Sequence, residues 1–344
     1  MDLPTAAPST PSIMAMADLA TPMSIRVAAT LSLVEHAGSA GATAEKLAAA
    51  TGTATSNLRR LLDHLVTIGV FDLETESGHY RPTKLGAQMS EDAPEGFKPL
   101  LDITSAGGRA ELAFVDLLGT ITTGTPAYEH RYERGFWADL DAHPELRRSF
   151  DAQMQWRFRT HAPQIAERFN WSRFSEIVDV GGGDGNLLTA ILRAHPEPRG
   201  RVLDLAPTAT AATDRFAAAG LDDRAHAVSG SFFDPLPSGA DAYLLSDILH
   251  DWDDDHARKI LTECRRAAAP DGTVVVVEPV LGRGTDTAMD LFMLMCFGGR
   301  ERTVDALTAL ATGCGLVLHA SGSVSDGRTV LEFRVAPHLG DERG

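Results

Sequence analysis

The segment Val178–Gly185, which reads Val-Asp-Val-Gly-Gly-Gly-Asp-Gly, has the residue types and spacing most indicative of chemistry. An acid, Asp204, follows the glycines after about twenty residues, the spacing at which an acid can bind a cofactor ribose. The alternative is an acid that ends a strand in water. We therefore predict a nucleotide-cofactor pocket at the first strand-to-helix turn of a Rossmann-like sheet.

The residue after this turn separates two kinds of cofactor. Asn186 stands where a pyrophosphate-binding fingerprint has glycine, which lets the helix N-terminus take the phosphates. With Asp179 before the glycines, it favours S-adenosylmethionine, which has an amino-acid tail and no phosphate. A NAD-dependent oxidoreductase is the alternative, and thermal stabilisation by NADH rather than S-adenosylhomocysteine would support it.

A histidine, His250, follows the fourth expected strand in the segment Leu-His-Asp-Trp-Asp-Asp-Asp-His. Doubly wound sheets bind ligands at the carboxyl ends of their strands, so His250 is expected beside the cofactor. A neutral imidazole there could remove the proton of a phenol. The alternative is a core histidine that only shapes the loop.

Two acids could act with this histidine. Glu278 ends a Val-Val-Val-Val strand at the same edge, and a buried acid needs a partner or a task. Glu301 precedes a helix that begins near Thr303, so helix capping is its alternative role. Either carboxylate could orient His250 and stabilise its protonated form.

The aspartates after Trp252 resemble a metal site, because carboxylates and His256 gather in a short span. Helix capping explains them better. Asp253 can cap the helix that runs to Ala269, and the next two acids suit its positive end.

Composition limits the classes of function. The chain has 344 residues, enough for two domains, and a net charge of −16, which disfavours nucleic acid and anionic membranes as partners. Its three cysteines form neither a disulfide framework nor a zinc pattern, which fits a cytoplasmic protein. No transmembrane run or secretory signal is recognisable, and residues 1–12 are expected to be a disordered tail.

The first half predicts helices and one hairpin. Met14–Ala37 is apolar on almost every face and interrupted by Pro22, so it should be buried, and another subunit is one surface that could cover it. A capped helix from Thr43 to Gly52, a second helix with periodic leucines and a hairpin around Gly78 resemble a winged helix. DNA binding is disfavoured because the candidate recognition helix has few basic residues.

The second half alternates strands with helices, which predicts a doubly wound α/β sheet. The final strand should join antiparallel, as a hairpin. The expected strands are Glu176–Val180, Arg201–Leu205, Ala225–Ser229, Ala242–Ser246, Thr273–Glu278, Leu316–Ala320 and Thr329–Val335.

Together these segments resemble the two-domain, S-adenosylmethionine-dependent O-methyltransferases of the caffeate type. More narrowly, they resemble the bacterial enzymes that tailor anthracyclines and other aromatic polyketides. The resemblance covers nearly the whole chain. It rests on Thr21-Pro-Met, the winged helix, Val178–Gly185, Leu249–Trp252 and Gly298–Thr303 in that order.

The resemblance implies a role for each matching position. His250 would be the general base, flanked by Glu278 and Glu301. The implied cofactor residues are Arg147 for the cofactor carboxylate, Gly181 for the methionine tail, Asp204 for the ribose, Ser231 and Phe232 on the adenine side, and Ser246 beside the cofactor on the fourth strand. The implied acceptor-pocket residues are Phe150, Met154, Phe292 and Cys296.

One position departs from the family pattern. Relatives often have aspartate where this chain has Ser231, and loss of one hydrogen bond would weaken cofactor binding by about 1 kcal/mol. From residue types alone, Phe232 could equally be core packing. The resemblance further implies a homodimer entwined through its N-terminal helices, and no metal.

These inferences give a domain plan and a function. The plan has a winged-helix-like dimerisation domain at 13–100, a helical linker and acceptor region at 101–170, and a Rossmann-like cofactor domain at 171–338. The expected reaction is methylation of a phenolic hydroxyl on a small aromatic metabolite. The alternatives are non-methylating chemistry on a similar substrate, or a winged-helix regulator that senses a small molecule. The acceptor, its reacting hydroxyl and any attached sugar are not specified by the sequence.

Overall fold

The computed structural model describes residues 12–268, 270–284 and 286–336, which form two compact units that divide between Leu112 and Ala113. The tail expected at residues 1–11 and the last residues of the expected cofactor domain, 337 and 338, lie outside the described residues. Ser12 is described, and its Oγ accepts a hydrogen bond from the Ala15 N–H at 3.1 Å at the start of the first helix.

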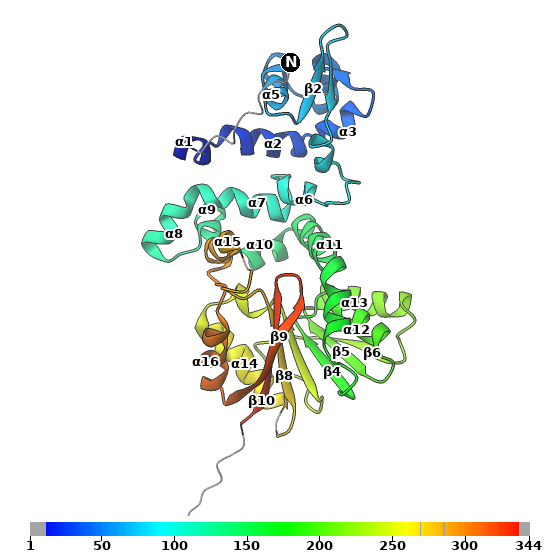
Figure 1. Ribbon diagram of the computed structural model, residues 1–344, viewed down its shortest axis with the longest axis vertical. Helices are drawn as coiled ribbons and strands as arrows, with labels where there is room; N and C mark the ends of the chain where they lie inside the picture. Colours follow the sequence, from blue (N-terminus) through cyan, green and yellow to red (C-terminus); the bar gives the residue numbers. More distant parts are fainter. Residues whose placement is uncertain (1–11, 269, 285, 337–344) are drawn as a thin grey trace, which may run out of the picture. The chain divides into compact units, whose positions relative to one another are not determined.

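The first unit contains the expected helices and hairpin (Figure 1). Strands β2 and β3 pair antiparallel around Gly78, and the short β1 pairs with β3. The helices are α1 (Ile13–Met16), α2 (Ala20–Thr30), α3 (Leu33–Ala37), α4 (Ala44–Thr51), α5 (Thr55–Thr67), η1 (Gly86–Met89), α6 (Lys98–Leu101) and α7 (Ala106–Leu112). The strands are β1 (Ala42–Thr43), β2 (Phe71–Glu74) and β3 (His79–Pro82).

The ends of α4 are those expected from the sequence. The Thr43 hydroxyl accepts a hydrogen bond from the Lys46 N–H at 3.4 Å, and Gly52 ends the helix with a φ of +67°. A left-handed residue at this position is easily adopted by glycine. In α5, the periodic leucines face the core of this unit, and Leu62 and Leu65 are fully buried.

The interpretation of Met14–Ala37 as a stretch broken at Pro22 is wrong. Pro22 lies in the first turn of α2, where a missing N–H costs no helical hydrogen bond. The chain instead leaves the helical path at residues 17–19, and again near Ser32, whose φ is +50°. Burial is also uneven, because Ala28 and Leu33 are buried whereas Met14 is 77% exposed.

The second unit begins with helices and continues into a seven-stranded sheet with the order β6-β5-β4-β7-β8-β10-β9. The leading helices are η2 (Ala113–Asp116), α8 (Leu117–Thr123), α9 (Ala127–Tyr132), α10 (Phe136–Ala142) and α11 (Pro144–Arg168). The strands are β4 (Glu176–Val180), β5 (Arg199–Asp204), β6 (Ala225–Ser229), β7 (Ala242–Ser246), β8 (Thr273–Glu278), β9 (Leu316–Ser325) and β10 (Arg328–Val335).

The pairing of the strands confirms the expected α/β sheet. Strands β4 to β8 are parallel, and β10 lies antiparallel between β8 and β9. The final hairpin is therefore present as expected. Because the parallel strands all end at one edge, the segments that follow β4, β5, β7 and β8 leave the sheet together there.

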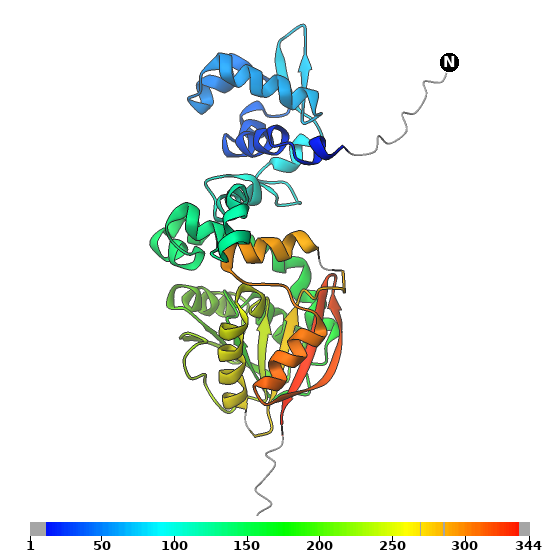
Figure 2. The ribbon, with the colours of Figure 1, turned by 90° about the vertical axis from the view of Figure 1, so that its left-hand side faces the viewer.

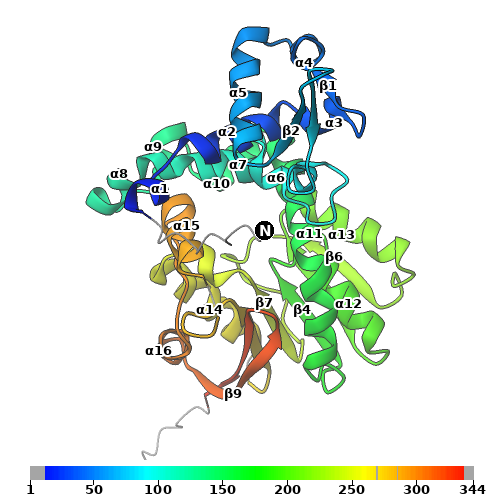
Figure 3. The ribbon, with the colours of Figure 1, turned by 45° about the horizontal axis from the view of Figure 1, so that its top comes forward.

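Helices cover both faces of this sheet (Figures 2 and 3). Helices α11, α12 and α13 pack on one face and α14 and α16 on the other, each against its own layer of buried apolar side chains. The remaining helical segments are α12 (Asn186–Ala194), α13 (Ala206–Ala218), η3 (Leu249–Asp251), α14 (Asp254–Ala268), α15 (Thr287–Phe297) and α16 (Val304–Gly313). The expectation that a helix fills every gap is wrong for residues 230–241, which join β6 to β7 without one.

Candidate active site

In the glycine turn between β4 and α12, the backbone has no side chain at Gly181, and two side chains from other segments lie close to it. Gly181 has a φ of +71°, and a Cβ there would stand 2.6 Å from Ile248 Cδ1 and 3.3 Å from Phe232 Cε1. Ile248 follows β7 and Phe232 follows β6. The expected turn thus meets the segments after two other strands at the carboxyl edge of the sheet.

Asp204 and Asp179 lie beside this turn. The Asp204 carboxylate accepts hydrogen bonds from the Gly183 N–H at 2.9 Å and the Leu205 N–H at 2.7 Å. Burial, and to a smaller extent the nearby negative charge of Asp204, raise the pKa of Asp179 to about 7. Asp179 Oδ2 is buried and has no hydrogen-bond partner among the described residues.

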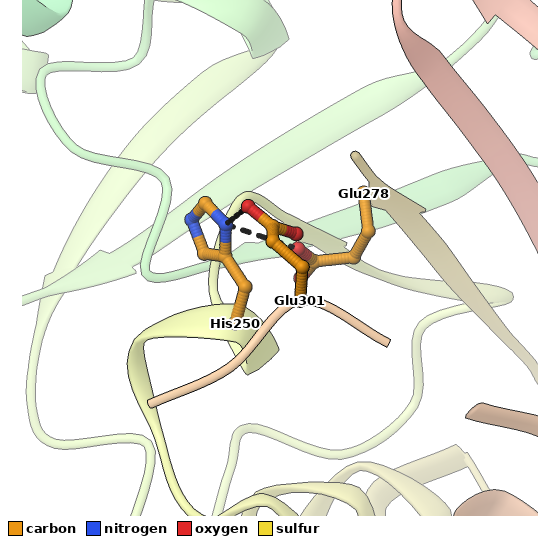
Figure 4. Close-up of side chains that lie close together, drawn as sticks. All are labelled: His250, Glu278 and Glu301. Atoms are coloured by element: carbon orange, nitrogen blue, oxygen red, sulfur yellow. Dashed lines mark hydrogen bonds and ion pairs between the residues drawn. The ribbon is translucent and has the colours of Figure 1, made fainter. Parts of the chain in front are cut away.

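His250 lies in the short helix η3 after β7 and is buried, with the carboxylates of Glu278 and Glu301 beside its Nδ1 (Figure 4). Its Nδ1 stands 3.0 Å from Glu301 Oε1 and 3.8 Å from Glu278 Oε2. On the opposite side of the ring, Nε2 stands 3.6 Å from Asp251 Oδ1. The two acids expected to flank His250 do so, and Asp251, expected only as part of the aspartate run, adds a third.

The acids set the charge of the imidazole. Burial disfavours the charged ring, but the negative charges of Glu278 and Asp251 and the hydrogen bond to Glu301 outweigh it and raise the His250 pKa to about 10. Burial also raises the pKa of Asp251, to about 6, and it raises the pKa of Glu278. The site therefore stabilises a proton on His250.

Glu278 also fixes the loop that carries His250. Its Oε1 accepts hydrogen bonds from the N–H groups of Ile248 at 3.0 Å and Leu249 at 2.7 Å. Its other oxygen, Oε2, is buried without a hydrogen-bond partner among the described residues. This buried oxygen therefore interacts with the imidazole through its charge and not through a hydrogen bond.

The expected helix cap at Thr303 is confirmed, but the Glu301 side chain bonds His250 instead of the helix. Thr303 caps α16, accepting a hydrogen bond from the Ala306 N–H at 3.1 Å, while the Glu301 side chain bonds His250. The Glu301 N–H donates to Asp290 Oδ1 at 2.8 Å, which fixes its backbone.

Arg302 was missed by the sequence reasoning, although it lies next to Glu301. Its Nη1 donates to the Leu249 carbonyl and its Nη2 to the Trp252 carbonyl, both at 2.8 Å, and it also pairs with Asp254. A buried arginine that bonds the carbonyls on both sides of His250 holds the loop. An arginine in a turn does not by itself predict that its side chain will be buried and will hold a neighbouring loop.

The aspartate run has mainly structural contacts. Asp253 Oδ1 accepts a hydrogen bond from the His256 N–H at 2.8 Å, as expected for a cap of α14. Among the described residues, the group of potential metal ligands is instead His250, Glu278 and Glu301, whose ligand atoms lie within 4.8 Å of one another.

The other expected cofactor residues with polar side chains lie after β6, at the end of β7 and on α11. Ser246, at the end of β7, has a buried Oγ without a partner among the described residues. Ser231 Oγ accepts a hydrogen bond from the Phe233 N–H at 3.2 Å. Arg147 pairs with Asp141 at 2.9 Å. Burial raises the pKa of Asp204, and the positive charge of Arg147 opposes this rise.

Three expected acceptor residues lie in or beside one aromatic cluster. The ring centroid of Phe150 is 5.5 Å from that of Phe136, which is 5.0 Å from that of Phe297. Phe292 lies 5.8 Å from Phe297. Cys296 is buried in α15 beside them, and the half-buried Met154 follows Phe150 by one turn of α11.

None of the described helices is both long and apolar enough to cross a membrane.

Comparison with known proteins gives a consistent result. Residues 114–317 match the O-methyltransferase domain family, and residues 14–91 match the O-methyltransferase dimerisation domain family. The chain is 46% identical to the 2,7-dihydroxy-5-methyl-1-naphthoate 7-O-methyltransferase of Streptomyces carzinostaticus, over 90% of this chain and 94% of that protein. It is 41% identical to the aclacinomycin 10-hydroxylase RdmB of Streptomyces purpurascens, over 92% of this chain and 86% of that protein.

A solved structure agrees over almost the whole chain. It is NcsB1, an O-methyltransferase from neocarzinostatin biosynthesis, in complex with S-adenosylmethionine and 2-hydroxy-5-methyl naphthoic acid. The TM-score is 0.91 at 44% identity, and the match covers 95% of this chain and 99% of that one. The sheet, the acid-flanked histidine and both domain matches lead to one conclusion: the chain belongs to the O-methyltransferase family and is an O-methyltransferase with that family's N-terminal dimerisation domain.

Proposed function

We propose that this enzyme transfers the methyl group of S-adenosylmethionine to a phenolic hydroxyl of a small aromatic metabolite, with His250 as general base. The observation that carries the proposal is the burial of His250, two residues after Ile248 at the glycine turn, with Nδ1 bonded to Glu301. The aromatic class, polyketide-like or anthracycline-like, is supported by the naphthoate and aclacinomycin relatives.

The residues at the turn fit the cofactor. Gly181 leaves space that a side chain would fill, and the buried oxygens Asp179 Oδ2 and Ser246 Oγ have no partner among the described residues. Unpartnered buried oxygens call for a ligand or water, since leaving them unpaired is costly. Bound S-adenosylmethionine supplies a methyl group on a positively charged sulfur.

Each expected residue has a place in this proposal. Asp204 binds the ribose hydroxyls, and Arg147 exchanges Asp141 for the carboxylate of the methionine tail. Ser231 and Phe232 border the adenine, the serine through a water because its hydroxyl is short. Phe150, Met154, Phe292 and Cys296 line the apolar pocket for the acceptor ring.

His250 prepares the acceptor. In the neutral ring, Nδ1–H donates to Glu301 and the unprotonated Nε2 accepts the phenol proton. Glu278 and Glu301 stabilise the imidazolium that results. Because the acids raise the His250 pKa to about 10, the neutral ring is a strong base toward a phenol. Because the same pKa keeps the ring protonated at neutral pH, turnover should rise with pH. No step requires a metal.

Non-methylating chemistry is the second candidate, because a relative at 41% identity is named a hydroxylase. The mass of the product separates the two functions. Incubation of the enzyme with S-adenosylmethionine and a dihydroxynaphthoic acid should add one methyl group to the acceptor. Addition of one oxygen atom instead would support the second candidate. Calorimetry should show binding of S-adenosylhomocysteine and not of NADH, and binding of NADH alone would contradict the cofactor assignment.

We further propose a homodimer formed through the N-terminal unit, in keeping with its family match, and a cytoplasmic location. The division at 13–100, 101–170 and 171–338 describes the dimerisation part, the helical acceptor region and the cofactor domain. A winged-helix regulator is disfavoured by the match of residues 114–317 to the O-methyltransferase domain and by the net charge of −16. A salt-dependent shift of a DNA duplex would support it.

A further inference from the structure

One face of α11 carries residues at helical spacing that run along the site. Arg147, Phe150, Met154, Arg157 and His161 are separated by three or four residues, so their side chains lie on the same face. Arg147 stands near Asp204, and Phe150 belongs to the aromatic cluster. Arg157 lies about 15 Å further along the helix than Arg147. It has no role in the function proposed above.

Arg157 is a partly buried cation whose partner is already occupied. Its Nη2 stands 3.5 Å from Asp247 Oδ2, with 24% of its side chain exposed. Asp247 is bonded through both oxygens to Arg328, with Nε at 3.0 Å and Nη2 at 2.5 Å. Within the described part of the chain, the guanidinium of Arg157 has no hydrogen bond to protein and no second ion pair. Two guanidinium groups therefore share one carboxylate.

The positive charge of Arg157, which Asp247 shares with Arg328, lies in a part of the fold that is close in sequence to His250. Asp247, the ion-pair partner of Arg157, lies three residues before His250 and four before Asp251. Asp251 is the acid on the Nε2 side of His250, whereas Glu278 and Glu301 lie on the Nδ1 side. Arg157 thus reaches the segment that carries His250 from the same helix as the apolar residues Phe150 and Met154.

A guanidinium with spare donors next to an apolar pocket suits one kind of group. Its planar fork matches a carboxylate and can donate two parallel hydrogen bonds. We propose that Arg157 binds a carboxylate on the acceptor, so that the acceptor is a hydroxyaryl carboxylic acid held at the ring by the apolar residues and at the acid by Arg157. The inference rests on the proposed function, because it concerns the acceptor of that same site.

The test compares an acid with its neutral ester. The probes are 1,4-dihydroxy-2-naphthoic acid, a ligand of the NcsB1 structure, and its methyl ester. Steady-state kinetics are measured for the wild type, Arg157→Met and Arg157→Lys. Arg168→Met is the control, because Arg168 is on the same helix and pairs with Asp326 at the surface, with 48% of its side chain exposed.

We expect Arg157→Met to raise the KM for the acid by about tenfold or more, because hydrogen bonds to a charged group are lost. Its KM for the ester should stay within about twofold of wild type. Arg157→Lys should recover part of the acid preference, since it restores charge without the fork. Arg168→Met should resemble wild type with both probes. Equal loss for acid and ester would mean that Arg157 only supports Asp247, and would overturn the proposal.

A binding measurement keeps this inference separate from the proposed function. The acid is titrated calorimetrically into each variant saturated with S-adenosylhomocysteine, so that no turnover is needed. Tighter binding to wild type than to Arg157→Met, without methylation, would contradict the methyl-transfer proposal and support the carboxylate site. Equal binding to both variants, or no binding to wild type, would overturn the carboxylate site even if the ester is methylated.

Discussion

At the scale of single residues, the chemistry depends on how three acids surround one imidazole. Glu301 bonds Nδ1 at 3.0 Å, Glu278 contributes charge at 3.8 Å, and Asp251 faces Nε2 at 3.6 Å. A histidine in this environment is a strong base that is charged at rest. Its pKa of about 10 implies a rate that rises with pH, because only the neutral ring accepts a proton.

This leads to a prediction for Glu278→Gln. The amide can keep the hydrogen bonds to Ile248 and Leu249 while removing the negative charge that most strongly raises the His250 pKa. The rising limb of the plot of kcat against pH should therefore move to lower pH. The measurement is kcat from pH 6 to pH 10, with wild type in parallel. A uniform loss of rate with an unmoved limb would contradict this role.

Asp179 gives a second prediction, on stability. Burial raises its folded pKa to about 7, above its unfolded value. Its contribution to stability is thus fully present below about pH 4 and is lost as pH rises through 7. Asp179→Asn should raise the Tm of the cofactor-free protein at pH 8 and change it little at pH 4. Thermal scans at both values test this, and an equal change at both would rule out the titration as its cause.

At the scale of elements, the sequence predicted the strands better than the helices. β4, β6, β7 and β8 have the expected bounds, because buried parallel strands are short apolar runs between turn residues. The break in Met14–Ala37 was misplaced, since Pro22 is tolerated in a first turn and nothing in the sequence announces the left-handed Ser32. The pairing of His250 with Glu301 joins residues far apart in sequence, which only the sheet topology brings together.

The loop between β7 and α14 depends on Arg302, which yields a prediction at this scale. Arg302→Met would leave the carbonyls of Leu249 and Trp252 without their donors, costing about 2–4 kcal/mol. We expect a lower Tm and a lower kcat, since the loop also carries His250. Arg300→Met is the matched control, because that side chain is 60% exposed and pairs with the same Asp254 at 3.7 Å. A similar Tm for both variants would contradict the role of Arg302.

At the scale of the whole molecule, the N-terminal unit exposes several apolar side chains to water. Such exposure does not stabilise a monomer. Ile13, Met14, Met16 and Leu19 are each at least 63% exposed. They lie in or beside residues 14–91, which match the dimerisation domain of the family. Adjacent exposed apolar residues of this kind mark an interaction surface.

We therefore expect the double variant Met14→Ser, Leu19→Ser to shift the protein from dimer toward monomer at low micromolar concentration. Light scattering after size exclusion measures the mass directly. Val317→Ser is the control, because that residue is apolar and 50% exposed but lies in the second unit. An unchanged mass for the double variant, or the same shift for the control, would contradict an interface at this surface.

The measurement that tests the central claim most directly is methyl transfer by His250→Ala, together with calorimetric binding of S-adenosylhomocysteine. The account predicts unchanged binding, since His250 is not among the proposed cofactor residues, and a loss of turnover by roughly 10²–10⁴. Unchanged turnover with intact binding would remove His250 from the mechanism and leave the positioning of the two reactants as the source of the rate.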